Sequence, residues 1–138
     1  MNLHTTNYFN AFILVAEDSP ANSGEVPPVK DGQLTAANIQ FEMVRKNPYR
    51  YTSDDVLFEV YAQKNDLTKT EYKAAREKFF SKGQACFRAS PLTKRYGWGV
   101  HSNAEGKIAL YGAETKEYAQ FLKNRSLTIV KAMRSSRS

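Results

Sequence analysis

The residues best suited to chemistry lie between positions 86 and 101. This stretch holds the chain's only cysteine, Cys86, and one of its two histidines, His101. A thiol becomes a nucleophile when a nearby imidazole accepts its proton, and Asp54 or Asp55 could orient that imidazole. Such a triad assembles only in the folded chain, so the sequence admits it without establishing it. A lone cysteine between Ala85 and Phe87 is most often a small buried side chain.

Basic and aromatic residues surround these two. Arg88 would lower the pKa of the Cys86 thiol if the two side chains met, which would favour reactivity. The residues of a ligand site would come from the same stretch, residues 86–101. Its candidate ligand-binding residues are Arg88, Lys94, Arg95, Tyr96, Gly97, Trp98, Gly99 and His101.

The alternation of large and small residues predicts a strand with two unlike faces. Alternate strand residues face opposite sides, so Tyr96 and Trp98 share one face. Gly97, Gly99 and His101 share the other, which lacks side-chain cover. Either a packed helix or a ligand must approach this bare strip. If a ligand approaches it, the strip forms the floor of a shallow site, and Lys94 and Arg95 lie near the mouth of that site.

Several familiar motifs fit this stretch poorly. The RNA-binding RNP1 pattern is met at four positions, but Arg95 stands where glycine is required, so base stacking on these rings has only partial support. Gly97-Trp98-Gly99 lacks the third glycine of a dinucleotide fingerprint, and no Walker A motif is present. His4, His101 and Cys86 do not have zinc-ligand spacing. The sequence predicts no metal and no cofactor.

The two halves of the chain differ in charge. Residues 1–63 contain four Lys or Arg and eight Asp or Glu, whereas residues 64–138 contain sixteen and six. The halves therefore carry −4 and +10, and together they give the formal net charge of +6. An asymmetry of this kind favours an anionic ligand, a nucleic acid or an acidic protein as the partner of the second half.

The elements that must position these residues follow from hydrophobic periodicity and capping signals. Strands are predicted at 8–16, 95–101, 107–112 and 126–133, and helices at 35–45, 68–82 and 114–123. A capping box at Thr52 and Asp55 favours a helix over 56–62, where a strand is the alternative. Residues 17–33 form a long loop with three prolines, and residues 134–138 a frayed tail.

This order predicts a single α+β domain over residues 1–138. The sheet is expected to be mixed or antiparallel, with helices on one face. The order resembles the split β-α-β (ferredoxin-like) arrangement with extra helices in the first crossover. No apolar run approaches the roughly 20 residues of a membrane helix, and a single cysteine fits a reducing compartment. We therefore expect a cytoplasmic protein that does not bind membranes.

Phrases along the whole chain resemble an uncharacterised family of small bacterial proteins, a domain of unknown function. The most distinctive are Tyr51–Ala62 (YTSDDVLFEVYA), Ser90–His101 (SPLTKRYGWGVH) and Lys131–Arg137 (KAMRSSR). The resemblance implies no activity, cofactor or site.

Three hypotheses for function follow. The first is a small binding module that engages an anionic ligand or acidic macromolecule through its basic C-terminal half. The second is a small enzyme that uses Cys86 and His101. The third is a structural or interaction protein that could dimerise through an exposed aromatic surface.

Overall fold

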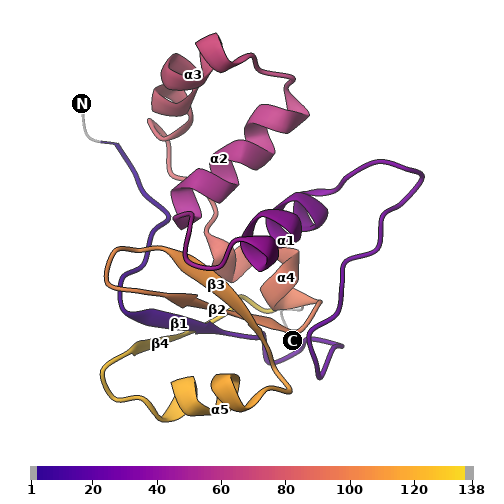
Figure 1. Cartoon of the computed structure of the whole chain (residues 1–138), viewed down its shortest axis with the longest axis vertical. Helices are drawn as coiled ribbons and strands as arrows, with labels where there is room; N and C mark the ends of the chain where they lie inside the picture. Colours follow the sequence, from indigo (N-terminus) through magenta and orange to yellow (C-terminus); the bar gives the residue numbers. More distant parts are fainter. Residues whose placement is uncertain (1–2, 136–138) are drawn as a thin grey trace.

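The computed structural model describes residues 3–135, and a four-stranded sheet lies at its centre (Figure 1). The strands are β1 (Ala11–Leu14), β2 (Trp98–Ser102), β3 (Ile108–Gly112) and β4 (Thr128–Lys131), in the spatial order β3-β2-β1-β4. β1 is antiparallel to β2 and parallel to β4, whereas β2 and β3 form an antiparallel hairpin. The sheet is therefore mixed, and the predicted α+β class is confirmed.

Helices occupy most of the connections between the strands. They are α1 (Ala36–Lys46), α2 (Ser53–Lys64), α3 (Tyr72–Phe79), α4 (Pro91–Lys94) and α5 (Lys116–Lys123), with 3-10 turns η1 (Lys69–Glu71) and η2 (Phe87–Ala89). Thr35 and Thr52 begin α1 and α2, and each forms a capping box that satisfies free N–H groups of the first turn. The helical interpretation of residues 56–62 is thus confirmed.

Several predicted elements have different bounds, and the strand predicted at 126–133 is shortened to Thr128–Lys131. The helix predicted at 68–82 is split into η1 and α3 and ends at Phe79. The strand predicted at 95–101 begins only at Trp98, because Gly97 has a φ of +76° that breaks the extended backbone. Ser90 instead caps the short α4, which was not predicted. The strand predicted at 8–16 is cut to four residues, since Asn10 has a φ of +49°.

The two faces of the sheet are covered by different elements. The main core lies between the sheet and α1, α2 and α4, where Val44, Val56 and Leu92 pack with Ile13 and Val100. These three helices lie on one face of the sheet, as predicted. α5 lies across the opposite face, however, so the prediction that the helices are confined to one face is wrong (Figure 1).

Helices α2 and α3 form a second, smaller core that extends away from the sheet (Figure 1). Phe58 and Ala62 of α2 are buried there with Phe80, which follows α3. Tyr72 and Phe79 of α3 pack edge-on against Phe58, with ring centroids 5.5 and 5.7 Å away. The pair is therefore held together mainly by aromatic contacts.

Residues 17–33 lie in the long connection between β1 and α1, and side chains hold this loop in place. The Asn38 amide donates to the Pro27 carbonyl at 3.0 Å, and the Trp98 indole donates to the Glu25 carbonyl at 2.8 Å. The predicted frayed tail falls mostly outside the described residues. Its described part is anchored, because the Ser135 N–H donates to the Asp18 carboxylate at 2.9 Å.

Candidate ligand site

Protein groups cover the bare glycine strip predicted from the sequence. A Cβ built on Gly99 would lie 2.5 Å from Cζ of Phe12 and 2.7 Å from a ring carbon of Tyr118 in α5. A Cβ on Gly97 would collide with the backbone carbonyl of Ser23 in the long loop. A helix and a loop, rather than a ligand, therefore occupy this face of β2.

The other residues predicted around the strip lie in separate parts of the structure. Trp98 is only 7% exposed, and the Arg45 guanidinium lies over its ring at 5.3 Å. Arg95 and Tyr96 line a cavity of about 250 Å³ beside Lys30, near the start of α1. Lys94 ends the short α4. These residues do not converge on one pocket.

His101 belongs to a polar network between the sheet and α5. Its Nδ1 lies 2.7 Å from the Tyr49 hydroxyl, which lies 2.8 Å from the Tyr111 hydroxyl. Its ring stacks on Phe121 with centroids 4.5 Å apart. Burial lowers the pKa of His101 and raises the pKa of Tyr49. The imidazole is therefore kept neutral at pH 7.

We expect this histidine to make stability depend on pH. Because the folded pKa is lowered, the unfolded chain binds a proton more readily once the pH falls below the unfolded value of about 6.5. The free energy of unfolding should then decrease from about pH 6.5 downward until the folded pKa is reached. Urea titrations of the native protein and of His101→Gln between about pH 5 and pH 8 test this. The variant should lose less stability at the acidic end, and equal slopes would contradict the prediction.

Cys86 has partners of its own. Its Sγ lies 3.6 Å from the Tyr8 hydroxyl, and burial together with this thiol raises the pKa of Tyr8. The neighbouring Arg88 donates from Nε to the Lys131 carbonyl at 2.7 Å, which attaches η2 to β4. Within residues 3–135, no hydrogen bond joins Cys86 to His101.

The two carboxylates predicted to orient the histidine lie at the start of α2 instead. Asp54 accepts hydrogen bonds from the Thr5 hydroxyl and from the backbone and hydroxyl of Thr6, each at 2.7 Å. Asp55 accepts from the Thr52 N–H at 3.0 Å and pairs with Arg76 at 2.9 Å. Both are therefore bound to the N-terminal segment or to the helix pair.

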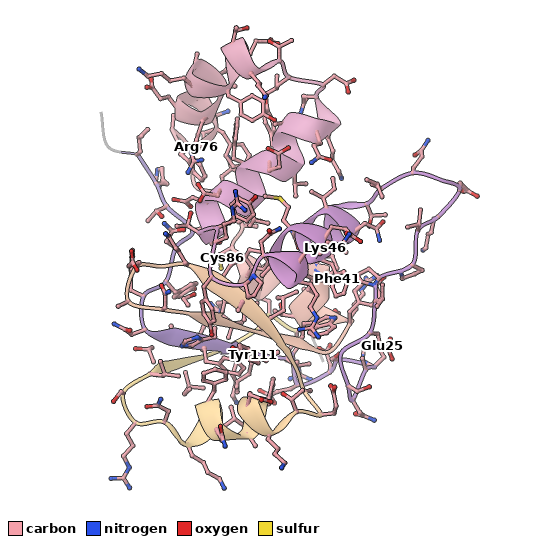
Figure 2. All side chains as sticks on the ribbon, viewed as in Figure 1. Glu25, Phe41, Lys46, Arg76, Cys86 and Tyr111 are labelled. Atoms are coloured by element: carbon pink, nitrogen blue, oxygen red, sulfur yellow. The ribbon has the colours of Figure 1, made fainter. Side chains whose placement is uncertain are left out.

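A larger concave surface lies along α3, and we call it the α3 cleft. It consists of two cavities of about 550 and 470 Å³, and Lys73 and Arg76 line both. Each cavity falls in the range of typical ligand pockets. Figure 2 shows Arg76 beside α2 and α3, whereas Tyr111 lies toward α5. The α3 cleft is therefore separate from the histidine network.

The larger cavity, which we call the tyrosine lobe, has an apolar wall and a charged rim. Its apolar lining is Met43, Tyr51, Phe58 and Tyr72, and its charged lining is Asp55, Glu59, Lys69, Lys73 and Arg76. The wall comes from α1, α2 and α3 and from the Tyr51 segment before α2. This lobe thus combines aromatic surface with cations at one side.

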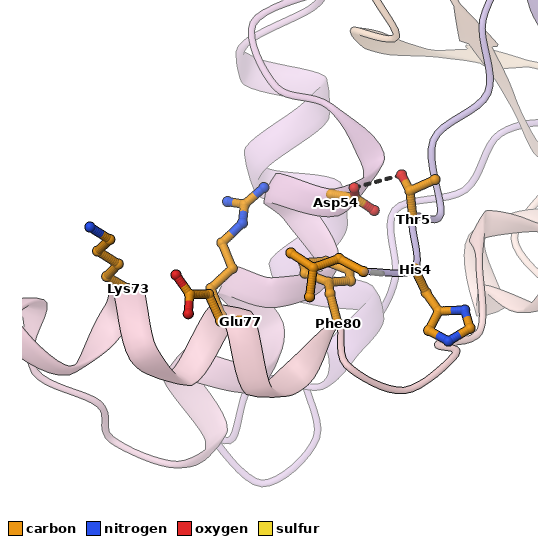
Figure 3. Close-up of a pocket in the computed structure, with 8 residues that line it drawn as sticks. His4, Thr5, Asp54, Lys73, Glu77 and Phe80 are labelled. Carbon is orange, nitrogen blue, oxygen red and sulfur yellow. Dashed lines mark hydrogen bonds between the residues drawn. The ribbon is translucent and has the colours of Figure 1, made fainter. Parts of the chain in front are cut away.

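The smaller cavity, which we call the N-terminal lobe, lies between α3 and residues 3–5. Figure 3 shows Lys73, Glu77 and Phe80 on the α3 side, opposite Thr5 and Asp54. The backbone N–H of His4 donates to the Phe80 carbonyl at 2.8 Å. The N-terminal segment is therefore fixed as one wall of this lobe.

The lysines of the tyrosine lobe are less engaged than its acids. Glu59 accepts from the Tyr72 hydroxyl at 3.2 Å and from the Gln63 amide at 3.0 Å, while Asp55 is paired with Arg76. Within the described part of the chain, no hydrogen bond or ion pair engages the side chains of Lys69 and Lys73. The tyrosine lobe is lined by Lys69, Lys73 and Arg76 against Asp55 and Glu59, so one positive charge remains.

The sequence held a signal for this cleft that the prediction did not use. Lys69, Lys73 and Arg76 are spaced i, i+4 and i+7, which places them on one face of a helical segment. The helix was predicted from the apolar residues Tyr72 and Phe79 instead. A row of cations at helical spacing usually marks a solvated surface, so only the aromatic wall opposite it makes the row distinctive.

The described residues hold no group of three His, Cys, Asp or Glu side chains that could bind a metal ion. In the same part of the chain, no helix has the length and apolar character needed to cross a membrane. A family model described as a family of unknown function, DUF6157, matches residues 3–138. No curated protein and no solved structure shows a significant match to the chain.

Proposed function

The chain belongs to DUF6157, a family without an assigned function, and we propose that it is a binding module whose α3 cleft holds a small anionic ligand. The cations that would contact the ligand lie in the basic C-terminal half of the chain. The proposal rests on one observation: Lys69 and Lys73 border a ligand-sized cavity whose carboxylates already have protein partners.

The geometry supports binding more than catalysis. Cys86 and His101 contact different partners, Tyr8 and Tyr49, and the imidazole ring lies against Phe121. The α3 cleft offers cations and rings but no cysteine among its lining residues. We also propose that the protein works in the cytoplasm, where a single cysteine remains reduced.

We expect small anions to bind the α3 cleft at low ionic strength. The probes are acetate, cyclohexanecarboxylate, benzoate and inorganic phosphate, each titrated into labelled protein and followed by NMR. Saturable shifts should appear for at least one anion in the backbone signals of α3 and of the first turns of α2. Lys73→Ala should weaken that binding about fivefold, because one charged contact at an exposed site contributes about 1 kcal/mol. Added salt should weaken it further.

A matched control exists on the same helix. Lys78 is also exposed and basic but lines a different cavity, with Tyr61 and Phe79. Lys78→Ala makes the same change in net charge, and it should leave the affinity within about twofold. If none of the probes binds saturably, or if the two variants weaken binding equally, the proposed site is wrong.

A further inference from the structure

We infer that the ligand of the α3 cleft is a small aromatic acid, with its ring in the tyrosine lobe and its anionic group between Lys69 and Lys73. This inference rests on the proposed anion site and adds the chemical class of the ligand. Aryl carboxylates and aryl phosphates both have this chemistry. Titration with one compound of each kind distinguishes between them.

The apolar wall of the tyrosine lobe is suited to a flat ring. Three of its four apolar members, Tyr51, Phe58 and Tyr72, are aromatic, and the fourth is Met43. Aromatic rings pack favourably edge to face or offset, and thioether sulfur also contacts rings favourably. Phe58 and Tyr72 already meet edge to face, at 84° and 5.5 Å. A ligand ring entering the lobe would extend this packing.

Two rings of the wall, and the backbone of the third, are held in place before a ligand arrives. Phe58 is buried, and its face lies 6.0 Å from the Arg76 guanidinium. Tyr72 is oriented by the hydrogen bond from its hydroxyl to Glu59. Tyr51 is fixed through its backbone, because its carbonyl accepts from the Ile108 N–H at 2.9 Å. A wall that is already ordered loses little entropy when a ligand binds.

The charges decide where the anionic group lies. Arg76 is occupied by Asp55, whereas Lys69 and Lys73 have no partner among the described residues. Both lysines border the same lobe as the aromatic wall. The N-terminal lobe offers Lys73 and Arg76 against Asp54 and Glu77 and has no net charge when His4 is neutral. An anion is therefore drawn to the tyrosine lobe.

The test compares ligands that differ only in the ring. Benzoate and cyclohexanecarboxylate carry the same charge on a six-membered ring, and the saturated ring has the larger apolar area, so hydrophobic burial alone would not favour benzoate. We expect benzoate to bind about threefold to tenfold more tightly, in the range of measured aromatic pair energies. Phenyl phosphate against cyclohexyl phosphate repeats the comparison. The better of the two aromatic compounds then identifies the anionic group.

Two variants test whether the aromatic wall of the tyrosine lobe causes the preference for an aromatic ligand. Tyr51→Leu keeps an apolar side chain but removes one of the three rings of the wall, and it should reduce the preference for benzoate over its saturated partner. Tyr61→Leu changes a tyrosine of α2 that borders a different cavity, and it should keep the preference. Equal affinities for the ring and its saturated partner in the native protein would overturn the aromatic assignment while leaving the anion site intact. Absence of binding by every anion would overturn both.

Discussion

Replacing Gly97 with alanine should destabilise the protein far more than the same change at Gly32. Gly97 has a φ of +76°, a conformation that costs an L-residue about 1–2 kcal/mol. A Cβ at this position would also collide with the Ser23 carbonyl, which belongs to the backbone and cannot rotate away. Overpacking of this kind typically adds about 1–3 kcal/mol. Urea unfolding should therefore show a total loss of about 3–4 kcal/mol.

Gly32 provides the control for the part of the stability loss that comes from backbone strain. Its φ is +71°, but nothing lies within 4 Å of the position that a Cβ would occupy. Gly32→Ala should cost only the backbone strain, about 1 kcal/mol. Equal losses for the two variants would show that the loop yields to the new methyl group. The close contact between the long loop and β2 would then be less rigid than the structure indicates.

Removing the ring of Phe12 should cost about 3–5 kcal/mol, the range for Phe→Ala changes in protein cores. Phe12 is fully buried, stacks on Phe121 at 4.8 Å and meets Tyr118 edge to face at 5.1 Å. It also fills the space in front of Gly99. Thermal or urea unfolding of Phe12→Ala measures the loss.

Phe9 serves as the comparison for this change. It lies three residues earlier and is 55% exposed, so Phe9→Ala leaves no enclosed cavity and should cost less than about 1 kcal/mol. A loss at Phe12 as small as that at Phe9 would mean that α5 contributes little to stability. In that case α5 would be a loosely attached cover rather than part of the core.

The sequence was most informative where local signals decide the structure. Thr35, Thr52 and Thr115 each begin a helix because their hydroxyls satisfy N–H groups of the first turn. The two strands of the β2–β3 hairpin, predicted at 95–101 and 107–112, followed from their hydrophobic periodicity. The family was also identified from its phrases, and the match over residues 3–138 confirms it.

Long-range contacts accounted for most of the differences between the predicted and the observed structure. The alternation around Gly97 and Gly99 predicts one continuous strand, and only the packed fold reveals that the backbone turns at Gly97, where Ser23 approaches. That α5 covers the second face could not be predicted from its own sequence. A short amphipathic helix carries no information about which side of a sheet it will occupy.

The candidate site was only partly predictable for a similar reason. The charge asymmetry pointed to the C-terminal half, and the cations of the α3 cleft do lie there. The choice of the stretch 86–101 followed the density of suggestive residues. Tyr51 and Met43 reach the cleft from other elements, and the pairing of α2 with α3 creates the cavity. No spacing within α3 alone specifies that pairing.

The pairing of β1 with β4 limits how early the domain can form during synthesis. Ala11 lies opposite Thr128, and the antiparallel neighbour of Ala11 on the other side is Ser102. Chains emerge from the ribosome from the N-terminus onward, and domains generally fold as units. The apolar β1 strand must therefore remain without either partner until most of the chain has been made. Sheets closed by such distant pairings also fold slowly. Until these pairings form, β1 is an exposed apolar segment of the nascent chain.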